Sequence, residues 1–121
     1  MLRIAMVAIA MALAGCVSNQ PREFTVFFET DDAAMTPEAQ KVVVQIAAAA
    51  RDAHPAKIVV EGQADGGTTH DAALADGRAD TVLHALADAG VDANSINKKP
   101  SAPLPGTVGV AAHKVKVTLI P

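Results

Sequence analysis

The sequence has 121 residues, of which 50% are hydrophobic and 2% aromatic, and its formal net charge is −3. This length allows a single domain. Nucleic acid is disfavoured as a partner, because there is no basic excess to neutralise phosphates and few aromatic rings on which bases could stack. All thirteen acidic residues lie between Glu23 and Asp92, whereas the tail beyond carries only lysines, so the last strand is expected to face solvent with its lysines. These tail lysines are Lys98, Lys99, Lys114 and Lys116.

The N-terminus has the pattern of a bacterial lipoprotein signal. Arg3 is followed by an apolar run of about eleven residues, too short to span the ~30 Å hydrocarbon core of a bilayer. The run ends in the lipobox-like sequence LAGC, and Cys16 is the only cysteine of the chain. We therefore predict a signal peptide over 1–15 and a lipidated Cys16 that anchors the protein stably in a membrane. Residue 17 is Val rather than Asp. The resemblance to the usual sorting pattern of Gram-negative lipoproteins then implies the outer membrane, with the domain in the periplasm.

A short tether is predicted to join this anchor to the folded part. The lipidated cysteine and tether occupy 16–23, and one domain occupies 24–121. Even fully extended, residues 17–23 span only about 25 Å at ~3.5 Å per residue. The domain is therefore expected to lie close to the membrane.

The first half of the domain is predicted to form a strand, a helix and a second strand. Strand 24–28 has three apolar residues on one face, namely Phe24, Val26 and Phe28. Thr36 is a good N-cap and Pro37 suits the first helical position, so a helix is expected from there to about Asp52. Its predicted buried face consists of Ala39, Val42, Val43, Ile46, Ala47 and Ala50. The apolar segment 56–62 is predicted to be a central, parallel strand.

The second half is predicted to add a helix and two strands. The helix covers 69–89 and ends at Gly90 in a left-handed cap. Its predicted buried stripe consists of Ala75, Ala79, Val82, Leu83 and Leu86. A short strand within 94–102, a loop over 103–109 and an alternating strand over 114–120 follow. The order β-α-β-α-β-β predicts an α+β two-layer sandwich, with two helices packed on one mixed parallel/antiparallel sheet.

Charged residues gather where the second predicted strand leads into the second helix. Asp65 lies in the connecting loop, and Asp71 and Arg78 lie about 20° apart on one helical stripe that becomes apolar further along. Ligands of open α/β sheets collect at this end of the strands. Asp65 and Arg78 could therefore hold a small zwitterion, with its carboxylate on the guanidinium and its ammonium on Asp65. Alternatively, the two residues pair with each other and only fasten the loop to the helix.

From residue 24 to residue 120 the sequence resembles the OmpA-like peptidoglycan-binding domain, which also occurs in peptidoglycan-associated lipoproteins. The resemblance rests on the segments FTVFFETDDAAMTPEAQ, IVVEGQAD and DAALADGRADTV. The last two match the family patterns V-x-G-H-x-D and N-x-x-L-S-x-x-R-A-x-x-V. In the family, the Asp and Arg of these patterns hold the diaminopimelate of the peptidoglycan stem peptide. The resemblance thus implies a non-covalent peptidoglycan binder that uses Asp65 and Arg78.

Several positions depart from the family pattern. Asp71 stands where the family has Asn, Ala75 replaces Ser, and Gln63 replaces His but can still hydrogen-bond. In the last strand the usual N-R-R-V is AHKV, so His113 and Lys114 replace two arginines that reinforce the site. The ligand set implied by the resemblance is Asp65, Arg78, Asp71, Gln63, His113 and Lys114.

Two other classes of function are alternatives to peptidoglycan binding. The histidines suggest a metal or acid–base site, but His70 and His84 lie ~21 Å apart along one predicted helix. The sequence also has no HExxH spacing and no activated Ser or Cys nucleophile, so we expect no enzyme activity, no cofactor and no metal. The alternative is a degenerate OmpA-like domain that serves as a protein-interaction subunit of a cell-envelope complex without binding peptidoglycan.

Overall fold

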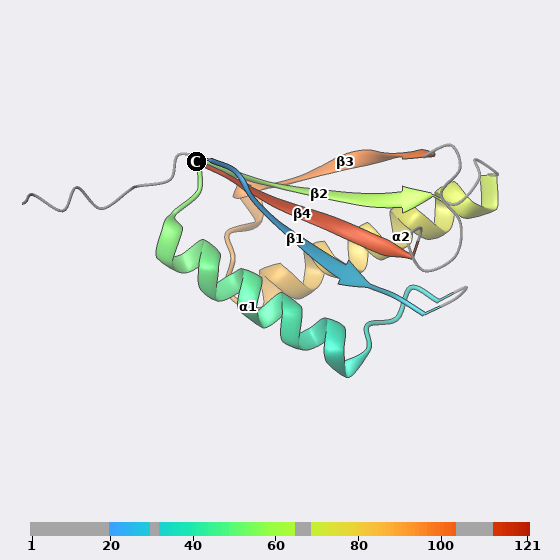
Figure 1. Cartoon of the computed structure of the whole chain (residues 1–121), viewed down its shortest axis with the longest axis horizontal. Helices are drawn as coiled ribbons and strands as arrows, with labels where there is room; N and C mark the ends of the chain where they lie inside the picture. The colour runs from blue at the N-terminus through green and yellow to red at the C-terminus, as the bar shows by residue number, and fades with distance from the viewer. Residues whose placement is uncertain (1–19, 30–31, 65–68, 104–112) are drawn as a thin grey trace, which may run out of the picture.

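A four-stranded sheet with two helices on one of its faces makes up the fold (Figure 1). The computed structural model describes residues 20–29, 32–64, 69–103 and 113–121. Its elements are β1 (Arg22–Phe27), α1 (Pro37–Ala53), β2 (Lys57–Ala64), α2 (Thr69–Asp88), the 3-10 turn η1 (Ala93–Ser95), β3 (Ile96–Pro103) and β4 (Lys114–Ile120). The predicted two-layer α+β sandwich is confirmed. The predicted signal peptide, Cys16 and most of the predicted loop 103–109 lie outside the described residues.

The strands are arranged in the order β1-β4-β2-β3. β4 pairs antiparallel with both β1 and β2, whereas β2 pairs in parallel with β3. The predicted central position of the second strand is confirmed, but β2 pairs in parallel only with β3 and pairs antiparallel with β4. Because of these directions, β1, β2 and β3 end where β4 begins, and we call this edge the carboxyl end of the sheet.

Helix α1 begins and ends as its local sequence predicts. The Thr36 side chain accepts a hydrogen bond from the Ala39 N–H at 3.1 Å, and Pro37 stands at the first helical position. The helix ends one residue after the expected Asp52, and His54 closes it in the left-handed region with φ 47°. Five of the six residues of the predicted buried face are buried, and Val42 is half-buried. The 3.6-residue period of apolar side chains therefore located this interface correctly.

Helix α2 ends in a Schellman motif. Gly90 has φ 97°, its N–H donates to the Ala87 carbonyl at 3.1 Å, and the Val91 N–H donates to the Leu86 carbonyl at 3.0 Å. Glycine adopts this backbone conformation without steric cost, which explains the predicted stop. The predicted stripe is buried at Ala75, Ala79, Val82 and Leu86, and Leu83 is partly buried against the core. No helix in the described ranges is long and apolar enough to cross a membrane.

The core lies between the helices and the inward face of the sheet. β4 alternates as predicted, with Val115, Val117 and Leu119 buried. β1 begins two residues before the predicted strand, and Phe28 just after it is buried, whereas Phe27 points away from the core and is 52% exposed. Because the described core runs from Val26 to Leu119, residues 17–121 contain every helix, strand and core residue of the structure.

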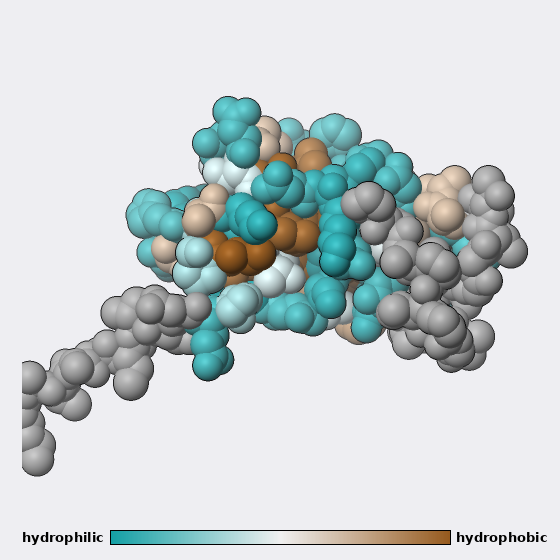
Figure 2. Space-filling view, turned by 90° about the horizontal axis from the view of Figure 1, so that it is seen from above, coloured by the Kyte–Doolittle hydropathy of each residue, from teal (hydrophilic) through white to brown (hydrophobic). Residues whose placement is uncertain are grey.

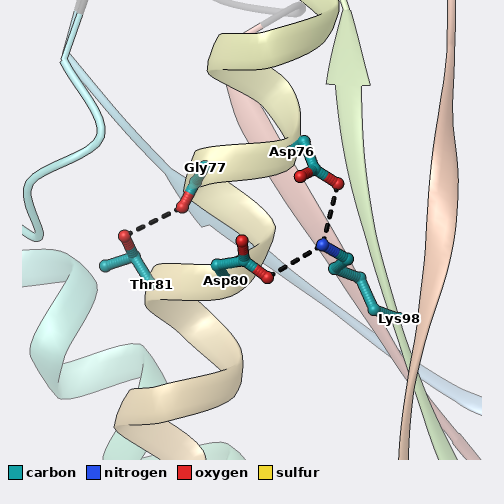
Figure 3. Close-up of polar contacts among 5 residues, drawn as sticks. All are labelled: Asp76, Gly77, Asp80, Thr81 and Lys98. Carbon is teal, nitrogen blue, oxygen red and sulfur yellow. Dashed lines mark hydrogen bonds and ion pairs between the residues drawn. The ribbon is translucent and has the colours of Figure 1, made fainter.

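The lysines of the tail have different environments. Lys98 on β3 points toward α2, where its Nζ lies 2.9 Å from carboxylate oxygens of both Asp76 and Asp80 (Figure 3). Hydrogen bonds to these two carboxylates raise the pKa of Lys98 above its ordinary value. On the opposite face of the sheet, Lys99 lies 3.7 Å from Glu61. The expectation for the lysines of the last strand did not extend to Lys98, which connects the edge strand β3 to α2.

Candidate functional site

Arg78 is a buried cation held at the carboxyl end of the sheet. Only 3% of the residue is exposed, although arginine is rarely buried unless it is paired. Its Nε donates to the Asp32 carbonyl at 2.8 Å and its Nη2 to the Glu29 carbonyl at 2.9 Å. The guanidinium carbon lies 5.7 Å from the centroid of the Phe28 ring, within the range of a cation–π contact. These contacts fix the position of the guanidinium between α2 and the chain that leaves β1.

The segment that receives Arg78 is itself ordered by side chains. Asp32 Oδ1 accepts a hydrogen bond from the Ala34 N–H at 2.8 Å, which forms an Asx-type turn. Thr81, three residues after Arg78, has its hydroxyl 2.9 Å from the Ala33 carbonyl and 3.0 Å from the Gly77 carbonyl (Figure 3 shows the second contact). Helix α2 therefore holds the β1–α1 connection at two points. Sequence reasoning missed these contacts because their acceptors are backbone carbonyls, which any residue provides.

The predicted polar-to-apolar stripe of α2 is present. Asp71 is half-buried in the first turn, and Ala75, Arg78 and Val82 are 1%, 3% and 0% exposed. Asp71 and Arg78 both interact with other groups in the structure. Asp65 lies outside the described residues, so its pairing with Arg78 or with a ligand stays a prediction.

Gln63 and Lys114 lie at the same end of the sheet but on its other face. The pairing of β2 with β3 has a register shift between Glu61 and Gln63, and the extra residue lies in β3. The side chains of β2 therefore continue to alternate between the two faces of the sheet. Val60 faces the core, and Gln63 is therefore on the face without helices, as is Lys114 next to the inward Val115. Gln63 is only 7% exposed, and within the described part of the chain its Oε1 has no hydrogen-bond partner.

His113 leads into β4 and is half-buried, and its carbonyl accepts a hydrogen bond from the Phe28 N–H at 2.7 Å. The structure thus gathers the described members of the predicted ligand set at the carboxyl end. Asp71 and Arg78 lie in the helix layer, whereas Gln63 and Lys114 belong to the opposite face of the sheet. A ligand that touches all of them has to extend around the end of the sheet.

A cavity of about 350 Å³ opens at the other end of the molecule. Its floor includes Ile58 and Val91, and its rim includes Arg51, His54 and Asp92, where α1 and α2 end. None of the described members of the predicted ligand set lines it. Within the described ranges, no group of three or more His, Cys, Asp or Glu side chains could hold a metal ion. The buried cation and the convergence of β1, β2 and α2 therefore make the carboxyl end the candidate site.

Comparison with solved structures finds the same fold in several proteins. The OmpA-like domain of FopA1 from Francisella tularensis superposes with a TM-score of 0.72 and 19% identity, covering 84% of this chain and 73% of that one. The peptidoglycan-associated lipoprotein from Burkholderia pseudomallei gives a TM-score of 0.62 and 22% identity over 79% and 87% of the two chains. The cell wall anchor of the T6SS from Pseudomonas aeruginosa gives a TM-score of 0.65 and 19% identity over 83% and 81%.

The sequence itself identifies the family. No curated protein matches the sequence. A family model does match it, namely the OmpA family, over residues 27–102. This region includes the end of β1, both helices, β2 and most of β3. Because the match covers more than half of the sequence, and the fold agrees with it, the chain belongs to the OmpA family.

Proposed function

We propose that this protein binds peptidoglycan non-covalently through the diaminopimelate of the stem peptide, at the carboxyl end of its sheet. The observation that carries the proposal is Arg78, whose buried guanidinium is fixed by the carbonyls of Glu29 and Asp32. Arg78 occupies the position of the family arginine in the segment DAALADGRADTV. A pre-positioned guanidinium loses little conformational entropy when it binds a carboxylate.

The chemistry at the site suits the zwitterionic end of a diaminopimelate side chain. Two of the five N–H groups of Arg78 are directed to the β1–α1 connection. A ligand carboxylate would accept hydrogen bonds from the guanidinium and would compete with the interactions that Arg78 makes in the absence of ligand. Charge-assisted hydrogen bonds are strongest where water is excluded, as at a 3% exposed side chain. The ligand ammonium would pair with Asp65.

We further propose that the chain is an outer-membrane lipoprotein anchored through Cys16, with its domain in the periplasm. β1 starts at Arg22, opposite Leu119 near the end of β4, and thus at the end of the sheet that is remote from Arg78. A tether attached there would be separated from Arg78 by the length of the sheet. β2 alone adds about 25 Å between the two ends, at ~3.3 Å for each of its 8 residues.

Sedimentation with purified sacculi tests peptidoglycan binding directly. Residues 17–121 should sediment with sacculi, whereas Asp65→Ala and Arg78→Lys should not, because Ala has no carboxylate and Lys lacks the planar fork. Thr81→Val is the matched control, since it disturbs the same connection but keeps the guanidinium. If the wild type stays in the supernatant, or if both site variants sediment like it, the proposal is wrong.

Metabolic labelling with a radioactive fatty acid tests the anchor separately. The full chain should be labelled and should fractionate with outer membranes, and Cys16→Ser should abolish both properties. Asp65→Ala serves as the control, because it leaves the lipobox unchanged. Label retained by Cys16→Ser would refute lipidation at this cysteine without bearing on peptidoglycan binding.

The second candidate function is that of an interaction subunit of an envelope complex with a silent pocket. Asp71 favours it, because it introduces a carboxylate where the family has Asn, and this carboxylate would repel a ligand carboxylate or compete for Arg78. The P. aeruginosa structure, a cell wall anchor of a secretion system, is an example of this fold within a larger assembly. Under this alternative, the wild type and both site variants would fail equally in the sacculus assay.

A further inference from the structure

The face of the sheet without helices carries most of the accessible positive charge of the strands. Strand alternation assigns four lysines and two glutamates to this open face, and Ile58, Val60 and Val115 beside them face the core. The six charged residues are Lys57, Lys99, Lys114, Lys116, Glu23 and Glu61. Within the described ranges, only Lys99 among these lysines has an ion pair, at 3.7 Å from Glu61.

The helix layer has the opposite balance. α1 and α2 together contain six acidic and three basic residues, and one of the basic residues is the buried Arg78. The molecule is therefore polarised, with a basic sheet face and an acidic helix face, although its formal net charge is −3. At physiological salt the Debye length is ~8 Å, so a flat partner close to the open face interacts with the lysines there more than with the distant acids.

The open face also exposes an aromatic ring. Phe27 is 52% exposed and lies opposite Lys114 in the β1–β4 pairing, and Lys116 lies opposite Thr25 two residues further along. In the view from above, a small hydrophobic patch surrounded by hydrophilic residues lies toward the end of the molecule that holds the C-terminus (Figure 2). An exposed aromatic side chain beside lysines is typical of surfaces that bind at the interface of a bilayer.

We propose that this open face docks on the anionic headgroups of a phospholipid bilayer. The lysines are spread over three neighbouring strands instead of converging on one point, which suits a diffuse, planar anion better than a single acidic side chain. Two glutamates on the same face limit the attraction, so the affinity is weak. The lipid anchor proposed above makes weak affinity sufficient, because a short tether creates a millimolar effective concentration of headgroups.

Co-sedimentation with vesicles tests this docking independently of lipidation. Residues 17–121 should bind vesicles of phosphatidylcholine and phosphatidylglycerol mixed two to one, should not bind phosphatidylcholine alone, and should be released at about 1 M salt. Lys57→Gln/Lys116→Gln should lower the partition coefficient by roughly twenty-five-fold, about fivefold per lysine. Phe27→Ser should lower it by roughly a further fewfold. The matched control is Lys41→Gln on α1, an exposed charge in the helix layer that should change binding little.

Three results would overturn the proposal. The first is that the wild type binds neutral and anionic vesicles equally well. The second is that Lys41→Gln lowers vesicle binding as much as the double variant does. The third is that the double variant binds vesicles like the wild type. Lys114 of the open face also belongs to the predicted ligand set, so it is left unaltered. Sedimentation of the double variant with sacculi then separates this inference from the proposed function, because neither Lys57 nor Lys116 belongs to the candidate site. If the double variant no longer sediments with sacculi but still binds vesicles, the open face contacts peptidoglycan instead of lipid.

Discussion

Arg78 offers the sharpest test of how the candidate site is held together. Arg78→Met keeps an unbranched side chain that can pack on Phe28, but it removes the donors to the Glu29 and Asp32 carbonyls. Hydrogen bonds with a charged partner contribute ~1.5–3 kcal/mol each. Burial of the guanidinium also costs desolvation energy, which Met avoids. Arg78→Met should therefore lower the free energy of unfolding by about 2 kcal/mol. For a domain of this size, that corresponds to a melting temperature lower by roughly 10 °C.

Urea unfolding of residues 17–121, followed by circular dichroism, measures this change. Arg51→Met is the matched control, since Arg51 is exposed and its bond to the Ala89 carbonyl is long, at 3.4 Å. The control should change the free energy of unfolding by less than about 0.5 kcal/mol. If Arg78→Met were no more destabilising than Arg51→Met, the buried guanidinium would not hold the β1–α1 connection.

Three further predictions concern a helix cap, an ion pair and the site. Thr36→Ala should lower the free energy of unfolding by about 1 kcal/mol, measured by urea unfolding, because the first turn of α1 loses its cap; a change near zero would contradict it. Hydrogen bonds to Asp76 and Asp80 raise the pKa of Lys98. The contribution of Lys98 to the free energy of unfolding should therefore be complete below pH 10.5 and disappear as the pH rises through its folded-state pKa. The stability difference between wild type and Lys98→Met should then shrink above pH 10.5, and a constant difference would argue against this linkage. Asp71→Asn should increase the fraction bound to sacculi by removing a competing carboxylate, and no gain would mean that Asp71 does not oppose the ligand.

The sequence alone determined the elements whose signals are local. Thr36 and Pro37 predicted the start of α1, and Gly90 predicted the end of α2, because capping and left-handed turns depend on neighbouring residues along the chain. The alternation of 114–120 predicted which side of β4 faces the core. The family patterns around Asp65 and Arg78 predicted the fold, which the OmpA family match and the solved structures confirm.

Only the tertiary structure decided what surrounds Arg78 and on which face each predicted site residue lies. The acceptors of Arg78 belong to residues 46 and 49 positions away in the sequence, and they are carbonyls, which have no side-chain signature. The family pattern groups Gln63 and Lys114 with Arg78, yet strand alternation puts them on the other side of the sheet. Sequence patterns encode capping, periodicity and side-chain type, because these are short-range. The environment of a buried cation depends on which backbone segments the folded chain brings beside it.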